Sequence, residues 1–189
     1  MCRALLDCLA ISLGGWTCPR PRPPPLLVPM LAMDAAASPM CPGRWQVGGF
    51  SHLTGMRVDL APEWATNQQL GELAAALYGI RLMLRLGCPH FHLLLDNRAI
   101  CHIILSLRPR ALHPVFPKVV RHVFNLLWET RATVFVSWVP SALQPGDYPS
   151  RVDLRLEGAA ELALARASSS WNFLTSHLGH LRYMGAVSL

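Results

Sequence analysis

Charged residues are scarce in this 189-residue chain, where they make up 15% of the sequence. Soluble domains usually carry roughly 25%. Hydrophobic residues make up 52%, so the chain can bury a core and disorder is excluded for most of its length. The surface of a free monomer would be unusually apolar. We expect either that the domain normally contacts another domain or chain, or that it has limited solubility alone.

Paired cysteine motifs and long apolar runs are also missing. The six cysteines form no CxxC pair and no Cys/His set with zinc spacing, which excludes the common zinc modules. Scattered reduced thiols are typical of an intracellular protein. No apolar run reaches the roughly 18 residues of a membrane span. Asp7 interrupts the short apolar stretch near the N-terminus, which argues against a signal peptide.

Lysine is nearly absent, because all but one of the 17 basic residues are arginine. Only 11 residues are acidic, which leaves a formal net charge of +6. The planar fork of arginine binds phosphate with two hydrogen bonds, so this balance favours a polyanionic partner. A compositional bias of the encoding genome is the alternative explanation.

Prolines separate a lead-in from the folded part of the chain. Five prolines lie between Pro19 and Pro25, and this stretch must be extended because proline cannot continue a helix. We predict a proline-rich lead-in over residues 1–25, a domain over residues 26–155, and a C-terminal tail over residues 156–189. A closing helix over residues 159–166 would lie in that tail.

Hydrophobic periodicity predicts the elements of the domain. Strands are expected at residues 26–33, 44–50, 55–60, 91–95 and 133–139, and helices at residues 67–86, 98–107 and 115–131. Thr66 and Gln69 have the spacing of a capping box at the start of the first helix. Three strands followed by alternating helices and strands indicate an α/β fold, in which helices flank a mixed sheet.

Three of the few carboxylates occupy related positions in this order of elements. Asp34 follows the first predicted strand, Asp96 follows the fourth, and Glu72 lies early in the first helix. Parallel neighbouring strands end at one edge of a sheet, so these acids are expected to meet there. Asp147, in the loop after the last strand, can join them.

Carboxylates that converge raise one another's pKa, so such a cluster is costly unless cations neutralise it. Mg²⁺ is the expected cation, because it prefers oxygen ligands. Each acid also has a local alternative. Asp34 and Asp96 could terminate strands, Glu72 could favour the helix dipole, and Asp147 could cap a short helix through Ser150.

Four segments resemble, in order, the motifs of the ribonuclease H domain of reverse transcriptases. They are LAMDA at residues 31–35, LGELAA at 70–75, LLLDN at 93–97 and VPSALQPGDYPSR at 139–151. The first three are short. The last is more specific and is similar to the form found in hepadnaviral polymerases and tyrosine-recombinase retrotransposons. The resemblance covers residues 26–153.

The resemblance implies a ribonuclease H-like fold with a five-stranded mixed sheet flanked by helices. It implies that Asp34, Glu72, Asp96 and Asp147 form a catalytic, metal-binding tetrad, with Asp153 as the reserve for the fourth position. The implied activity is hydrolysis of the RNA strand of RNA/DNA hybrids with two Mg²⁺ ions, for which Mn²⁺ can substitute. The implied setting is a retroelement reverse transcriptase.

Polar residues beside the acids are candidates for binding the hybrid, because sensing RNA requires hydrogen bonds to 2′-hydroxyl groups. These candidates are Asn67, Gln68, Asn97 and Arg98, which could equally be helix caps and solvated loop residues. Basic residues along the second and third predicted helices could track phosphates, or form a solvated face. They are Arg98, Arg108, Arg110, Lys118, Arg121 and Arg131.

Two features of the family are absent from the chain. No Tyr-x-Asp-Asp motif of a polymerase is present, so a polymerase domain or chain is an expected partner. The loop before Asp147 offers Ser141, Leu143 and Gln144 where cellular members carry a histidine, which puts histidine-assisted proton transfer in doubt. The alternatives are a catalytically inactive, truncated retroelement remnant that binds nucleic acid, or a DNA nuclease of the same superfold.

Overall fold

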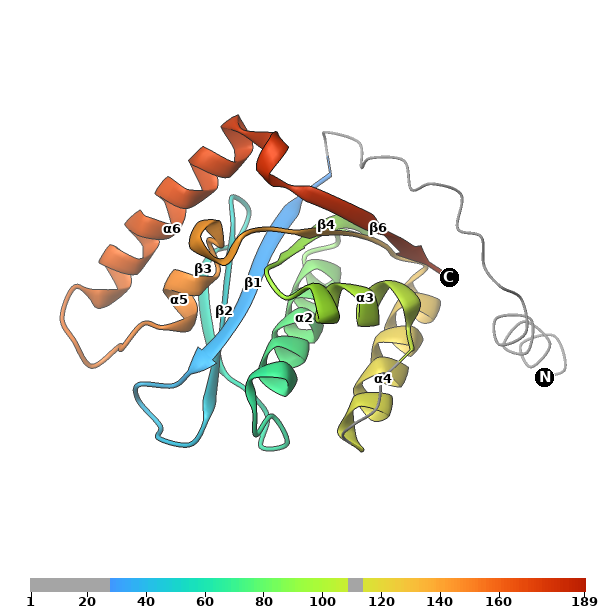
Figure 1. The fold of residues 1–189 in the computed structure, drawn as a ribbon, viewed down its shortest axis with the longest axis horizontal. Helices are drawn as coiled ribbons and strands as arrows, with labels where there is room; N and C mark the ends of the chain where they lie inside the picture. The colour runs from blue at the N-terminus through green and yellow to red at the C-terminus, as the bar shows by residue number, and fades with distance from the viewer. Residues whose placement is uncertain (1–27, 109–113) are drawn as a thin grey trace, which may run out of the picture.

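The structure is a computed structural model that describes residues 28–108 and 114–189, so the predicted lead-in lies outside the described residues. Six strands form one sheet in the order β3-β2-β1-β4-β5-β6 (Figure 1). Strand β4 is parallel to both β1 and β5, and the other neighbours are antiparallel. The strands are β1 (Met30–Ala37), β2 (Trp45–Ser51), β3 (Gly55–Leu60), β4 (His90–Leu95), β5 (Thr133–Trp138) and β6 (Arg182–Ser188).

Helices cover both faces of this sheet. They are α2 (Gln68–Arg85), α3 (Arg98–Ser106), α4 (Val115–Thr130), α5 (Asp147–Ser150) and α6 (Ala159–Ser176), with short 3-10 turns η1 (Ser141–Leu143) and η2 (Leu178–His180). Leu31 and Met33 of β1 pack in the larger core with α2 and α4. Ala32, between them, packs in the smaller core with Trp171 and Leu174 of α6, because alternate strand residues face opposite sides.

Helix α2 forms over the predicted range, and its buried leucines recur at steps of three and four residues. The predicted capping box at Thr66 is wrong. Asn67 is the N-cap, and its side-chain oxygen accepts a hydrogen bond of 3.0 Å from the Leu70 amide. The backbone of Asn67 is extended while Gln68 already begins the helix, which places the cap one residue later than expected.

Strand β1 runs further than predicted, so Asp34 lies inside the strand and not after its end. Beyond Asp34, residues 35–37 continue to pair with β2, down to Ala37 opposite Trp45. Alanine has a low strand propensity, and here the pairing with β2 overrides it.

The expected five-stranded sheet has a sixth strand, β6, within the segment predicted to be a tail. It pairs with β5 across an irregularity at Val136 and Ser137, and Val187 adds to the larger core. That irregularity, and Gly185 at φ 151, break the alternation by which a strand is recognised in sequence. The segment 156–189 therefore adds one strand to the sheet, and the helix expected at residues 159–166 extends to Ser176. Of the helices described, none is long and apolar enough to span a membrane.

Candidate active site

The pairing of β1 with β4 brings two of the predicted acids together. In this parallel pair Ala32 lies opposite Leu94. Asp34 and Asp96 each follow two residues later, so they extend from adjacent strands toward the same side. Asp34 is buried, with 5% of its surface exposed. The predicted proximity of these two carboxylates is present in the structure, since the charge of Asp96 acts on Asp34.

The carboxyl group of Asp34 is held in an environment that disfavours its charge. Burial, with the negative charges of Asp96 and Asp147, raises the pKa of Asp34 from 3.8 to about 7. The hydroxyl of Ser150, 2.7 Å from Asp34 Oδ2, acts in the opposite direction and stabilises the charged form. Asp34 is therefore only partly ionised at neutral pH.

Glu72 reaches the same region from the second turn of α2. Its Oε1 accepts a hydrogen bond of 2.9 Å from Gln68 Nε2, and its Oε2 accepts one from Asn97 Nδ2. Burial raises the pKa of Glu72, the two hydrogen bonds lower it, and the charge of Asp96 raises it. Two of the residues predicted to bind substrate therefore orient Glu72.

Asp147 lies at the start of α5 and is the fourth acid of the group. Its Oδ1 is 2.5 Å from Arg151 Nε, and its charge raises the pKa of Asp34. The reserve candidate, Asp153, is instead bound through both carboxylate oxygens to Arg155, at 2.8 and 2.7 Å. The structure thus brings Asp147, and not Asp153, to Asp34.

Two glycines let α5 approach the strand that carries Asp34. A Cβ atom on Gly48, the partner of Asp34 in β2, would lie 2.1 Å from the Ser150 nitrogen. A Cβ atom on Gly146 would lie 3.0 Å from the Asp34 nitrogen. Gly48 therefore needs glycine for lack of space, and a side chain at Gly146 would press on the backbone of β1. These glycines, and Ser150 as a partner of Asp34, were not singled out from the sequence.

Gln144 lies in the loop before Asp147, which contains no histidine. It is 1% exposed, and its Nε2 donates hydrogen bonds to the carbonyl oxygens of Met33 and Leu94, at 3.0 and 3.2 Å. Its Oε1 has no hydrogen-bond partner among the described residues. Gln144 thus links β1 to β4 directly beside the acids, a structural role in place of proton transfer.

The remaining predicted substrate residues also have partners in the protein. Asn67 caps α2, which is the alternative interpretation considered above. The guanidinium of Arg98 lies 4.3 Å from the ring centre of Trp138, whose Nε1 donates a 2.7 Å hydrogen bond to the carbonyl oxygen of Asp96. Arg98 is therefore fixed close to the acids. Arg110 lies outside the described residues.

The donor chemistry of the acids fits Mg²⁺, since carboxylate oxygens are its preferred protein ligands. Because the pKa of Asp34 is raised, this carboxyl group is incompletely charged on its own, and a nearby cation would favour its charged form. Within residues 28–108 and 114–189, however, no three His, Cys, Asp or Glu side chains are arranged to hold a metal ion. The expected common site for all four acids is therefore not preformed, because Glu72 and Asp147 are engaged by protein partners.

Comparisons of the chain with known proteins identify its fold. No model of a known protein family and no curated protein matches the chain. The chain is similar to the N-terminal RNase H domain of Rv2228c from Mycobacterium tuberculosis, solved as a fusion with maltose-binding protein, with a TM-score of 0.50 and 17% identity over 76% of this chain and 97% of the other. It is also similar to RNase H1 from Halobacterium salinarum, with a TM-score of 0.51 and 15% identity over 62% and 89%. The chain has a ribonuclease H-like fold.

Proposed function

We propose that this chain is an endonuclease that hydrolyses the RNA strand of RNA/DNA hybrids, with Asp34, Glu72, Asp96 and Asp147 as its catalytic acids. One observation carries the proposal. Acids from two adjacent parallel strands and from α2 act on one another electrostatically, within a ribonuclease H-like fold. Fold alone does not fix a function, so the proposal rests on this site.

The proposal includes Mg²⁺ as the cofactor, with Asp34 and Asp96 as its first ligands. Bound Mg²⁺ would neutralise the carboxylates and supply Lewis-acid chemistry at the phosphodiester. The protein would contribute the position of each acid. Gln68 and Asn97 orient Glu72, and Ser150 orients Asp34. Arg151 would have to release Asp147 before that carboxylate could serve as a ligand.

We further propose that the chain acts with a polymerase domain or chain, as in a reverse transcriptase. Support comes from the motif at residues 139–151 and from the apolar surface around α6. Four leucine side chains are exposed there, with 41–63% of the surface of each residue accessible to solvent. They are Leu154, Leu156, Leu162 and Leu164. Several large apolar side chains exposed on one segment are typical of a region that contacts another protein.

Cleavage of a labelled RNA/DNA hybrid in Mg²⁺ tests the activity. We expect the wild-type chain to cut the RNA strand, and Asp34→Asn or Glu72→Gln to lower the rate by at least about a hundredfold, since groups at a reacting phosphate are worth several kcal/mol. Asp153→Asn is the matched control, because this carboxylate is bound to Arg155. Duplex DNA, offered in parallel, tests the alternative of a DNA nuclease.

The inactive alternative has a specific observation in its favour, namely that no three acids are gathered for a metal among the described residues. It predicts hybrid binding that weakens with salt and no cleavage in Mg²⁺ or Mn²⁺. Equal cleavage by wild type, Asp34→Asn and Glu72→Gln would remove these acids from catalysis, and absence of cleavage in all three would favour the remnant.

A further inference from the structure

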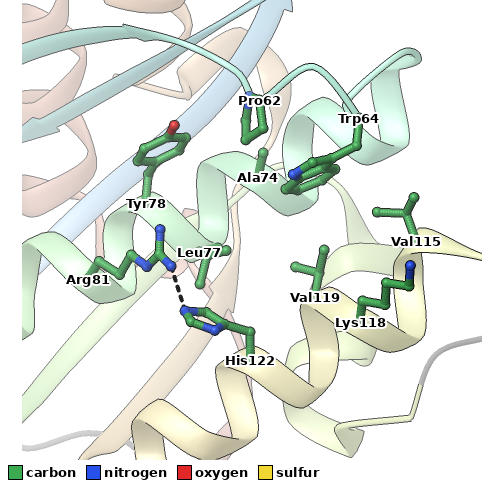
Figure 2. A pocket seen from close by; sticks show the side chains of 10 residues that line it. All are labelled: Pro62, Trp64, Ala74, Leu77, Tyr78, Arg81, Val115, Lys118, Val119 and His122. Atoms are coloured by element: carbon green, nitrogen blue, oxygen red, sulfur yellow. Dashed lines mark hydrogen bonds between the residues drawn. The ribbon is translucent and has the colours of Figure 1, made fainter.

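A cavity of about 340 Å³ lies between α2, α4 and the segment that joins β3 to α2 (Figure 2). On α2 it is lined by a stripe of residues at steps of three and four: Ala74, Leu77, Tyr78 and Arg81. Glu72 is not part of this stripe or of the lining. The cavity is therefore separate from the acidic site, although both use α2.

Aromatic and aliphatic side chains form most of the cavity wall. Trp64 and Tyr78 lie along one side, and Figure 2 shows them on the rim together with Pro62. Leu77 and Val119 are buried beneath them. A volume of this size, with an apolar wall and few polar groups, is typical of a site for a small organic molecule.

The polar groups of the lining are Arg81, Lys118 and His122, and no carboxylate is among the lining residues. Arg81 Nη2 lies 2.6 Å from His122 Nε2, and Figure 2 shows this hydrogen bond at the edge of the cavity. The guanidinium is the donor, so His122 accepts through Nε2. Arg81 keeps its other N–H groups for a further acceptor.

Lys118 is exposed on α4, and no hydrogen bond or ion pair joins its ammonium group to another described residue. Arg57 stacks near the rim, with its guanidinium 5.5 Å from the ring centre of Tyr78, but its charge is paired with Asp59. A ligand that carries a negative group would therefore meet two cations, Arg81 and Lys118, beside an apolar wall. A cationic ligand would be repelled.

We propose that this cavity binds a small aromatic anion. Its ring would pack against Trp64 and Tyr78, and its acidic group would accept hydrogen bonds from Arg81 and Lys118. The anionic group could be the phosphate of a mononucleotide or the carboxylate of an aromatic acid, which share this chemistry. The proposal is independent of the nuclease activity, because it uses none of the acids.

Titration calorimetry on the full chain in EDTA tests the proposal with four probes: AMP, indole-3-acetate, adenosine and indole. EDTA removes divalent ions, so phosphate cannot bind at the acids through a metal. We expect at least one anion to bind at least about tenfold more tightly than its neutral counterpart, as charge-assisted hydrogen bonds require. AMP alone would identify phosphate, indole-3-acetate alone would identify carboxylate, and both would identify charge as the determinant.

Lys118→Glu reverses the charge of an exposed lining residue and should weaken anion binding by at least about tenfold. Arg121→Glu is the matched control, because it makes a charge reversal at an exposed cation on α4 outside the lining. Asp34→Asn should retain the anion affinity of the wild type. The proposal would be overturned if neither anion bound at 10 mM, if neutral probes bound equally well, or if Lys118→Glu weakened binding no more than Arg121→Glu.

Discussion

The two sides of α2 face charges of opposite sign, buried acids on one side and cations at the edge of a cavity on the other. On one side the charge of Asp96 acts on both Glu72 and Asp34, and these two carboxylates are almost fully buried. On the other side Arg81 and Lys118 border an open cavity. Glu72 and Asp34 are hydrogen-bonded to neutral side chains of the protein, whereas Lys118 lies at the surface without such a partner among the described residues.

This difference has an energetic consequence. A buried carboxylate loses hydration, and a second carboxylate nearby adds repulsion, so the acidic side reduces the stability of the empty protein. Exposed cations keep most of their hydration, and the basic side has little such cost. The acidic side therefore gains most from a bound cation. Removal of a charge should stabilise the protein on the acidic side and have little effect on the basic side.

Asp34→Asn should stabilise the protein at pH 8, which is the largest of these effects. The folded pKa of about 7 lies above the ordinary value of 3.8, so the folded state binds more protons between these values and stability falls as pH rises from 4 to 7. Asparagine removes this loss and can still accept from Ser150. The gain at pH 8 is on the order of 4 kcal/mol by linkage, for a pKa that shifts from 3.8 to about 7.

Urea unfolding of both proteins from pH 4 to pH 8 measures this gain, which should shrink toward zero at pH 4. Asp153→Asn, which removes a carboxylate bound to Arg155, should give no gain at any of these pH values. A gain for Asp34→Asn that did not depend on pH would mean that burial of the charge is not its cause.

Gly48→Ala should destabilise the protein by about 2–3 kcal/mol, the usual cost of overpacking a closed site. The added Cβ would overlap the backbone at Ser150, so α5 would have to move away from β2 and Ser150 from Asp34. Gly179→Ala is the control, because nothing lies within 4 Å of its Cβ position. Equal urea midpoints for the two variants would show that α5 can shift at no cost.

The acidic side could be predicted in part from the sequence, because Asp96 follows a clear strand and Glu72 lies on a clear helix, although Asp34 proved to lie inside its strand. The strands around Asp96 and the helix that carries Glu72 have clear periodic patterns, and the structure has these elements. What holds the acids in place could not be predicted. Ser150 and Gly48 are about a hundred residues apart in the chain, and their contact with the site depends on how α5 packs.

The basic side could not be predicted for a related reason. Lys118 was one of the cations expected on the third helix and Arg81 lies within the first predicted helix, but only the packing of α4 against α2 brings them to one cavity. Strand β6 was missed because its pairing with β5 is irregular at Val136 and Ser137. Local patterns therefore identified elements and motifs, and contacts between distant segments determined the rest.

Mg²⁺ at 10 mM should raise the melting temperature of the wild type, the smallest of these effects. An ion that binds only the folded state at ten times its dissociation constant adds about 1.4 kcal/mol, which is about 3–5 °C for a domain of this size.

Asp34→Asn should lose this shift, because it removes the buried charge that the ion neutralises. Lys118→Glu should keep it, because Lys118 lies on the other side of α2. A shift that survived in Asp34→Asn would place the ion elsewhere, and no shift in the wild type would mean that the hydrogen bonds to Glu72 and Asp147 outcompete the ion.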